Sequence, residues 1–334
     1  MVGPRHASET RQLPSKPCRP RVTLHFTTSS TFGPTHLRVA GRAGDILRFP
    51  GSKIRLKLSH VNLSQLSQRL RYELRGWAYW AECANPFRGT VTARHLPLGL
   101  RMEGYKRDAV GRGLYRRGLH EPGPTKFVLE TFANASGKSF LDVGGNIGYF
   151  SCLFGKLAGP TGQVVAIEPE PRNRHLLERN LRNNELTNVN VIGYAVGAAT
   201  LTAKMGLYKA ANRGRHSLVD LEPCKEFIEV PVRRLDDLLQ DAGVDSWTAM
   251  KLDAEGYEPY ILQGAQQTLP LVETLLMEYA PIYWKKAGFD PAVVFQQLVP
   301  HFSKMYRFEG TSLVPISVAT CCQTNTTYDL VLTK

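Results

Sequence analysis

A short apolar segment that ends in a glycine turn constrains the fold of this chain more than any other feature. Residues 139–143 read Ser-Phe-Leu-Asp-Val, and residues 144–148 read Gly-Gly-Asn-Ile-Gly. The first segment suits a strand buried in a parallel sheet, and glycine permits a sharp turn and the close approach of a ligand. A helix-like pattern follows from Tyr149 to Leu157. Strand, glycine turn and helix in this order are typical of a nucleotide-binding α/β unit.

The glycine spacing indicates which kind of nucleotide this unit binds. It is Gly-Gly-x-x-Gly, whereas pyrophosphate-binding turns have Gly-x-Gly-x-x-Gly, and no P-loop motif occurs in the chain. Glu168 follows the next apolar segment, 26 residues after Asp142. An acid at the end of the second strand is placed to accept hydrogen bonds from both ribose hydroxyls. A nucleoside without a phosphate chain fits this pattern, and S-adenosylmethionine is such a molecule.

The remaining patterns predict a Rossmann-like α/β fold. Strands that alternate with helices predict a mostly parallel sheet with helices on both faces, and two late strands without a helix between them predict an antiparallel edge strand. The seven expected strands cover residues 139–143, 163–169, 189–196, 248–256, 272–279, 305–308 and 328–332. Residues 200–233 read as an inserted β segment with a polar loop at 209–217.

Charge and proline content set the N-terminal third of the chain apart. Residues 1–120 hold 22 Lys/Arg and 6 Asp/Glu, whereas residues 121–334 hold 20 and 23. Residues 1–50 contain six prolines, two acids and no sustained apolar period, which predicts a disordered basic extension. We expect residues 51–109 to form a cap region, with a helix from Leu56 to about Ala84 and a strand over 96–102, and residues 110–334 to form the catalytic domain.

The cysteine spacing and the hydropathy of the chain indicate the cellular compartment in which the protein is expected. None of the six cysteines forms a Cys-x-x-Cys pair, so we expect reduced thiols and a cytoplasmic protein. No apolar run approaches the roughly 18 residues of a membrane-spanning helix, and no signal-peptide core follows the first basic residues. The Arg-, Ser- and Thr-rich composition of residues 1–50 also matches an organelle transit peptide, which stays open as an alternative. The oligomeric state is left open.

Acidic residues follow several of the expected strands. Asp142 lies in the first, Glu168 follows the second, Asp253 and Glu255 lie near the end of the fourth, and Glu278 lies near the end of the fifth. Ligands in open α/β sheets bind at the carboxyl ends of the strands. The sequence therefore predicts a ligand site where these acids meet.

A series of short motifs follows the predicted elements in order along the chain. They are Leu141–Phe150, Ala166–Pro169, Leu181–Asn184, Val230–Leu239, Lys251–Glu258 and Leu276–Glu278, after a Gly-x-x-Glu-Pro segment at 118–122. With these motifs the chain resembles the FkbM-type methyltransferases. The resemblance covers roughly residues 110–281, and its most specific part is the Lys-x-Asp-x-Glu-Gly segment at 251–256. Gly145 departs from the family, which more often carries Ala at this position.

The resemblance implies a class I methyltransferase fold and methyl transfer from S-adenosylmethionine, usually to a hydroxyl of a sugar or another small molecule. The residues that it implies for the cofactor are Asp142, Gly144, Gly145, Asn146, Glu168 and Pro169. It places Asp253 and Glu255 near the methyl group and the acceptor. A hydroxyl nucleophile gains from a general base, for which Asp253 is the first candidate, Glu255 the second and His216 the third. No metal ligands are predicted.

Three alternatives stay open at this stage. A nucleic-acid methyltransferase would use the basic N-terminal third as its grip, but the motif of exocyclic-amine enzymes is missing after the fourth strand, where the chain reads Asp253-Ala-Glu-Gly. A nicotinamide-dependent oxidoreductase would need Gly-x-Gly-x-x-Gly and a Tyr-x-x-x-Lys pair. A binding protein that lost catalysis would have little reason to keep Asp142, Glu168 and Asp253. A small-molecule hydroxyl acceptor is therefore the expected partner, rather than nucleic acid.

Overall fold

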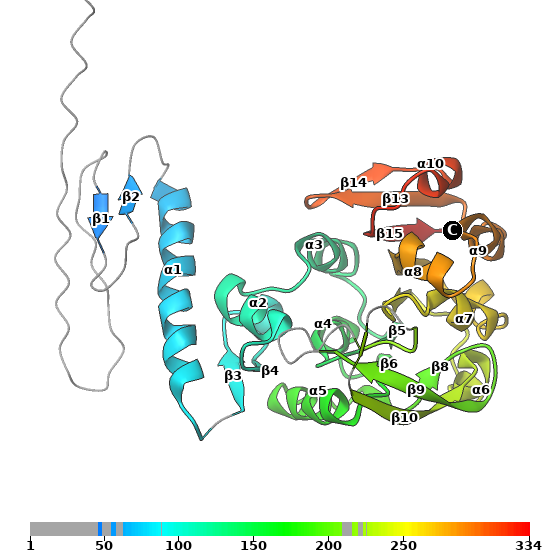
Figure 1. Cartoon of the computed structure of the whole chain (residues 1–334), viewed down its shortest axis with the longest axis horizontal. Coiled ribbons are helices and arrows are strands. Elements are labelled where there is room, and N and C mark those ends of the chain that lie inside the picture. The colour runs from blue at the N-terminus through cyan, green and yellow to red at the C-terminus, as the bar shows by residue number, and fades with distance from the viewer. Residues whose placement is uncertain are drawn as a thin grey trace, which may run out of the picture. The chain divides into compact units, whose positions relative to one another are not determined.

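The computed structural model describes residues 46–48, 55–57, 63–87, 89–208, 216–219, 223–224 and 226–334 (Figure 1). The chain divides into two units, residues 1–72 and residues 73–334. In the first, β1 (Ile46–Arg48) pairs antiparallel with β2 (Arg55–Lys57). Apart from β1, the predicted disordered extension lies outside the described residues. The second unit holds every predicted site residue.

An eight-stranded sheet forms the centre of the second unit. Five neighbouring strands are parallel, in the order β12, β11, β5, β6 and β7. Their bounds are Thr274–Tyr279 for β12, Ala249–Leu252 for β11, Ser139–Val143 for β5, Gln163–Ile167 for β6 and Val189–Ile192 for β7. The α/β fold with a mostly parallel sheet is confirmed.

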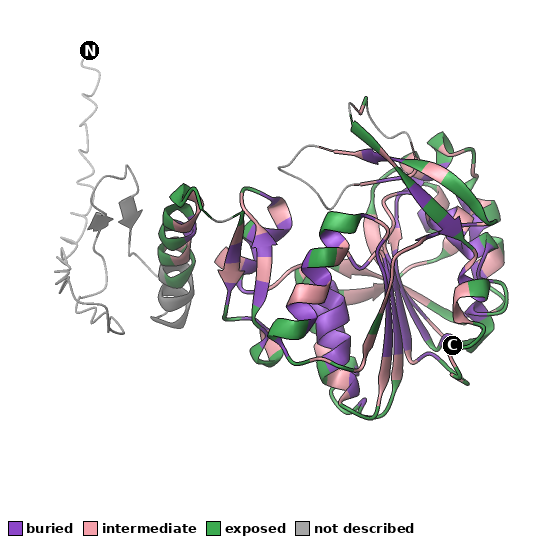
Figure 2. Ribbon diagram, turned by 90° about the horizontal axis from the view of Figure 1, so that it is seen from below, coloured by how far each residue is buried: buried purple, intermediate pink, exposed green. Residues whose placement is uncertain are grey.

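Helices cover both faces of this sheet because neighbouring residues of a strand point to opposite sides. On β5, Phe140 packs into the core beneath one helix layer and Leu141 into the core beneath the other. The first layer holds α3 (Pro122–Thr131), α4 (Tyr149–Ala158) and α5 (Pro171–Asn183). The second holds α6 (Leu235–Leu239), α7 (Glu258–Gln263), α8 (Pro281–Lys286), α9 (Pro291–Leu298) and α10 (Val318–Cys322), with a 3-10 turn at Leu269–Leu271. Figure 2 shows the buried strands between these layers.

The C-terminal edge of the sheet is antiparallel, as predicted, but it has one more strand than expected. β15 (Tyr328–Thr333) is antiparallel to both β12 and β13 (Lys304–Glu309), and β14 (Ser312–Pro315) pairs antiparallel with β13 as the edge strand. The sheet thus has eight strands rather than seven, because the sequence patterns do not reveal β14. Its four residues include only two consecutive apolar side chains and end in a proline, which a sheet edge tolerates.

The expected strand over residues 189–196 is two strands in different sheets. β7 ends at Ile192, and β8 (Ala195–Val196) pairs parallel with β10 (Glu226–Arg233) in a separate three-stranded sheet. β10 also pairs antiparallel with β9 (Leu201–Leu207), which confirms the inserted β segment. Most of the polar loop that joins β9 to β10 lies outside the described residues.

The segment before the sheet contains a helix, a hairpin and a second helix. α1 spans Leu63–Ala84, so its predicted start at Leu56 is wrong. The expected strand over 96–102 is also wrong, because Pro97–Gly99 form a 3-10 turn in which Leu98 has a φ of 55°. The strands on either side are β3 (Thr90–Ala93) and β4 (Met102–Tyr105), which pair antiparallel, and the following helix is α2 (Ala109–Arg117).

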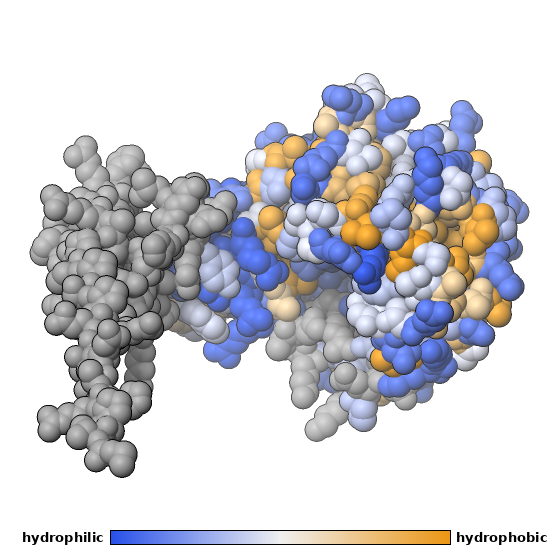
Figure 3. Space-filling model, turned by 90° about the horizontal axis from the view of Figure 1, so that it is seen from above, coloured by the Kyte–Doolittle hydropathy of each residue, from blue (hydrophilic) through white to orange (hydrophobic). Residues whose placement is uncertain are grey.

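Hydrophilic and hydrophobic side chains intermingle on the face of the second unit that Figure 3 shows. Among the described residues, no helix combines the length and the apolarity needed to cross a bilayer. The five cysteines in this part of the chain are free thiols.

Candidate functional site

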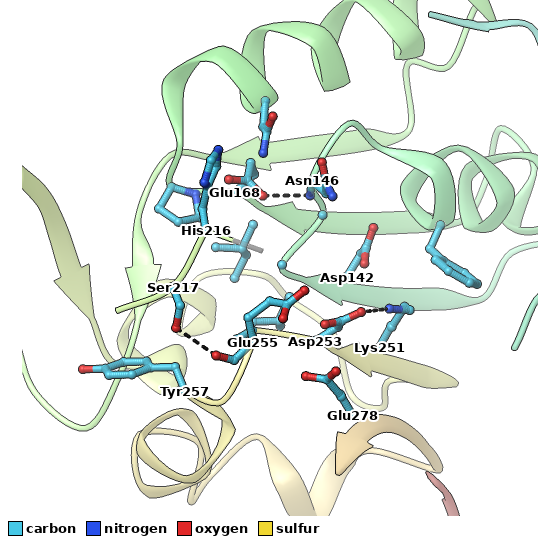
Figure 4. Close-up of a pocket in the computed structure, with 18 of the residues that line it drawn as sticks. Asp142, Asn146, Glu168, His216, Ser217, Lys251, Asp253, Glu255, Tyr257 and Glu278 are labelled. Carbon is cyan, nitrogen blue, oxygen red and sulfur yellow. Dashed lines mark hydrogen bonds and ion pairs between the residues drawn. The ribbon is translucent and has the colours of Figure 1, made fainter. Parts of the chain in front are cut away.

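A cavity of about 500 Å³ lies at the carboxyl ends of the central strands (Figure 4). All ten residues singled out from the sequence line it, namely Asp142, Gly144, Gly145, Asn146, Glu168, Pro169, His216, Asp253, Glu255 and Glu278. The inserted sheet adds Ala195 and Met205 to its wall, and β15 adds Asp329. The site predicted from local motifs is therefore one site in space.

Glu168 connects the end of β6 to the glycine turn after β5. Its carboxylate is buried and accepts hydrogen bonds from the backbone N–H groups of Asn146 at 2.7 Å and Glu170 at 2.8 Å. Asn146 lies at the tip of the turn with a φ of 50°, in the left-handed region. Burial raises the pKa of Glu168 to about 7, although the two N–H donors oppose that change. The acid therefore fixes the shape of the turn as well as facing the cavity.

Gly144 is required by a contact within the protein. It has a φ of 89°, and a Cβ at this position would lie 1.8 Å from the carbonyl oxygen of Asp253. The loops after β5 and β11 can approach this closely only with glycine at this position. At Gly145, a Cβ would lie 3.0 Å from Leu177 Cδ1, so alanine fits there only if Leu177 shifts.

Asp142 lies beneath the turn and is 2% exposed. The hydroxyl of Ser151, on the first turn of α4, donates a hydrogen bond to its carboxylate at 2.5 Å. Burial raises the pKa of Asp142 to about 6, against the lowering effects of Ser151 and Lys251. Burial therefore favours the uncharged form of this carboxyl.

Asp253 forms an ion pair with Lys251, which sequence reasoning did not assign to the site. The ammonium of Lys251 is 2.6 Å from Asp253 Oδ2 and 3.4 Å from Glu121 Oε2, and it lies 4.7 Å from the centre of the Phe150 ring. Burial opposes the charge of Lys251, but the neighbouring carboxylates raise its pKa well above the usual range. One oxygen of the first predicted base is thus committed to a buried cation.

Glu121 extends this network toward the segment before α3. Its φ is 43°, and its Oε1 pairs with Nε2 of His120 at 2.9 Å. Burial alone would raise the pKa of Glu121, but Lys251 and His120 hold it at about 2. Both His120 and Glu121 line the cavity. The Gly-x-x-Glu-Pro segment was the signal for them, but it assigned them no role.

The inserted segment carries His216 and also contacts the loop that carries Glu255. The hydroxyl of Ser217 donates a hydrogen bond to the Glu255 carbonyl at 2.8 Å, and Glu255 has a φ of 51°. Nδ1 of His216 accepts the backbone N–H of Tyr208 at 3.1 Å. Both residues line the cavity, His216 from the inserted segment and Glu255 from the loop after β11.

Three carboxylates near the end of β11 have the spacing of a metal site. One oxygen each of Asp253, Glu258 and Glu278 lies within 4.8 Å of the other two. Glu258, however, is fully buried, and its oxygens accept the N–H groups of Ala254, Gly256 and the Trp284 indole. Because Lys251 also pairs with Asp253, internal donors already use this set, and we assign no metal to it.

Comparison with known proteins identifies the domain. Residues 142–305 match the model of the methyltransferase FkbM domain. The chain carries an FkbM methyltransferase domain. The FkbM domain has the Rossmann-like class I fold that the resemblance implied, and the nicotinamide-dependent alternative receives no support.

Two curated relatives are also methyltransferases. Methyltransferase sdnD of Sordaria araneosa is 28% identical to this chain over 192 residues, which cover 48% of this chain and 72% of the relative. Methyltransferase 1 of Beauveria bassiana is 24% identical over 195 residues, which cover 50% of this chain and 78% of the relative.

Solved structures of methyltransferases resemble the FkbM domain more distantly. Methyltransferase FkbM from Methylobacillus flagellatus aligns with a TM-score of 0.38 at 18% identity, over 59% of this chain and 44% of that chain. The alignment thus spans less than half of the length of that protein. An S-adenosylmethionine-dependent O-methyltransferase from Thermotoga maritima aligns with a TM-score of 0.36 at 14% identity, over 65% of this chain and 66% of that one.

Proposed function

We propose that this protein transfers a methyl group from S-adenosylmethionine to a hydroxyl of a small molecule such as a sugar. The observation that carries the proposal is the hydrogen bond from the backbone N–H of Asn146, in the glycine turn, to the carboxylate of Glu168. Both residues line the cavity of the FkbM domain. A cavity of about 500 Å³ has the size of an ordinary small-molecule site.

The residues around the turn fit a nucleoside cofactor. A carboxylate has about four acceptor sites, and Glu168 uses two for the N–H groups of Asn146 and Glu170. The remaining sites can accept the two ribose hydroxyls. Pro169 adds an apolar surface beside them, and Asp142, Gly144, Gly145 and Asn146 line the adjoining wall. When bound, S-adenosylmethionine supplies an electrophilic methyl group on a positively charged sulfur.

The acceptor end of the site is rich in carboxylates. Asp253 and Glu255 follow β11, and Glu278 lies near the end of β12. Carboxylates orient a hydroxyl by accepting its hydrogen bond and can also accept its proton. Methyl transfer needs the hydroxyl oxygen in line with the methyl group, so orientation supplies much of the rate. Oxygen is favoured over nitrogen as the acceptor atom because the exocyclic-amine motif is missing at 253–256.

A methyl-transfer screen tests this function. The full chain is incubated with tritiated S-adenosylmethionine and with sugars, glycolipids, hydroxylated metabolites or RNA. We expect acid-stable label on a hydroxylated small molecule. Label on RNA alone would overturn the assignment of the acceptor, and failure to bind S-adenosylhomocysteine in calorimetry would overturn the assignment of the cofactor.

A further inference from the structure

We propose that Asp329, on β15, accepts the proton of the acceptor hydroxyl, and that Glu278, opposite it on β12, is its uncharged neighbour. This inference rests on the proposed methyl transfer and names a residue that lies beyond the matched domain, which ends at residue 305. It differs from the expectation drawn from the motifs, which favoured Asp253.

The two carboxyl groups are cross-strand partners. Glu278 lies directly opposite Asp329 in the antiparallel pairing of β12 with β15, and both line the cavity. The Cβ atoms of directly opposite residues are about 4.5–5.5 Å apart, and like charges in such positions repel. The pair is therefore most stable when at least one member carries a proton.

No cation pairs directly with either group among the residues that the structure describes. Lys251 directs its ammonium to Asp253 and Glu121. Oε2 of Glu278 is buried and has no hydrogen-bond partner within the described part of the chain. The carboxyl of Asp329 forms no hydrogen bond or ion pair with any described residue, although it lines the cavity. Its oxygens are thus available to a hydroxyl in the cavity.

The charged groups around Asp329 and Glu278 indicate which of the two accepts the proton and which stays uncharged. Burial raises the pKa of Asp329 to about 7, and Glu121 and Asp253 raise it further against the opposing effects of Lys251 and His120. Burial also raises the pKa of Glu278 well above its usual range. The charged neighbours that strengthen this second effect are Asp253, Glu258, Glu255 and Asp329. The acids around Glu278 thus favour its uncharged form, whereas Lys251 and His120 favour the charged form of Asp329.

Asp329 suits the task better than Asp253 does. A general base works best when its pKa is near the working pH. If Asp253 accepted a proton, its ion pair with Lys251 at 2.6 Å would weaken, and the buried ammonium would lose one of its two partners. Protonation of Asp329 breaks no such contact, so Asp253 is better suited to orienting the acceptor.

The proposed step balances in atoms and charge. A bond forms between the hydroxyl oxygen and the methyl carbon, and the carbon–sulfur bond breaks with its electron pair going to sulfur. The positive sulfonium becomes a neutral thioether, and the hydroxyl proton goes to the carboxylate of Asp329. No metal ion, oxidant or further reactant is needed.

Cofactor binding can test whether Asp329 lies beside the methyl group, and this test does not require a known acceptor. A base that bonds to the attacking hydroxyl must lie within about 6 Å of the methyl carbon. An ionised Asp329 should therefore favour positively charged S-adenosylmethionine over neutral S-adenosylhomocysteine. In calorimetry on the full chain, we expect the affinity ratio of these two ligands to rise on the order of tenfold between pH 5.5 and 8.5.

Two variants and a control test whether Asp329, rather than Glu278, causes the pH dependence of the affinity ratio. Asp329→Asn should reduce the pH dependence of the ratio to the part that Asp142 and Glu168 contribute, whereas Glu278→Gln should preserve most of it because glutamine resembles a neutral carboxyl group. The exposed acid Asp237, on α6, supplies the control Asp237→Asn, which should behave as wild type. A flat ratio in the wild type, or an unchanged rise in Asp329→Asn, would overturn the role of Asp329 while leaving the cofactor assignment intact. Failure of the wild type to bind either ligand would overturn both.

Discussion

The carboxylate of Glu168 accepts a hydrogen bond from the backbone N–H of Asn146 at 2.7 Å. The acid at the end of β6 and the glycine turn after β5 therefore form one structural unit. A change at Glu168 removes a ligand-facing group and also a support of the turn.

Replacing Glu168 by alanine should weaken S-adenosylhomocysteine binding at least about tenfold, since charge-assisted hydrogen bonds contribute about 1.5–3 kcal/mol. Glu168→Gln keeps one acceptor oxygen for the turn and should bind better than alanine does. Isothermal titration calorimetry measures both, with exposed Glu229→Gln on β10 as the control. Wild-type affinity in Glu168→Ala would show that the ribose lies elsewhere.

Lys251→Met should lower the free energy of unfolding by about 3 kcal/mol, because the carboxylates of Asp253 and Glu121 then lose their buried partner. Urea denaturation measures this loss. The control Lys126→Met removes a surface pair with Glu130 and should cost at most about 0.5 kcal/mol. Equal effects of the two changes would contradict a structural role for the buried cation.

Asp253→Asn should reduce turnover much more than cofactor affinity, since it removes a charged group that orients the acceptor. Glu255→Gln should have a smaller effect. Single-turnover methyl transfer, with an acceptor found in the screen, gives the rate, and calorimetry gives the affinity. If both variants kept wild-type turnover, the segment after β11 would have no direct part in the reaction.

The protein without cofactor should be more stable at pH 5 than at pH 8. Burial raises the pKa of Asp142 to about 6 and that of Glu168 and Glu258 to about 7. Because these folded-state values exceed the unfolded ones near 4, the stabilisation is present below pH 4 and is lost as pH rises through 6 and 7. A tenfold change in the proton affinity of one carboxyl on folding corresponds to about 1.4 kcal/mol.

Urea denaturation at the two pH values checks this trend. Glu168→Gln should show a smaller loss because it removes one of the titrating groups. A free energy of unfolding that is constant or rises from pH 5 to pH 8 would contradict the burial of these carboxyls in the uncharged form.

A chain that begins at Lys53 should bind S-adenosylhomocysteine and turn over an uncharged acceptor like the full chain. Residues 1–50 have six prolines and too little apolar sequence to offset their chain entropy. Calorimetry and thermal denaturation compare the two chains. A melting temperature several degrees lower, or a loss of activity, would show that the N-terminal residues pack against the domain.

The cavity wall around the glycine turn could be predicted because its signals are local. Asp142, the glycine turn and Glu168 each lie within a few residues of a strand end, and the topology of parallel sheets brings such ends together. The short edge strand β14 and the helices α8 and α10 could not be predicted, since elements of four to six residues are too short to show a hydrophobic period.

The sequence by itself determined the α/β fold, the strand–turn–helix unit and the acids that follow its strands, because each is written in neighbouring residues. Only the tertiary structure decided which charged side chains lie next to one another in the cavity. Lys251 pairs with Glu121, which is 130 positions earlier in the chain, and the register of β12 with β15 sets Asp329 opposite Glu278. A one-residue slip in that register would turn every side chain of β15 to the other face, so no local pattern could have specified the pair.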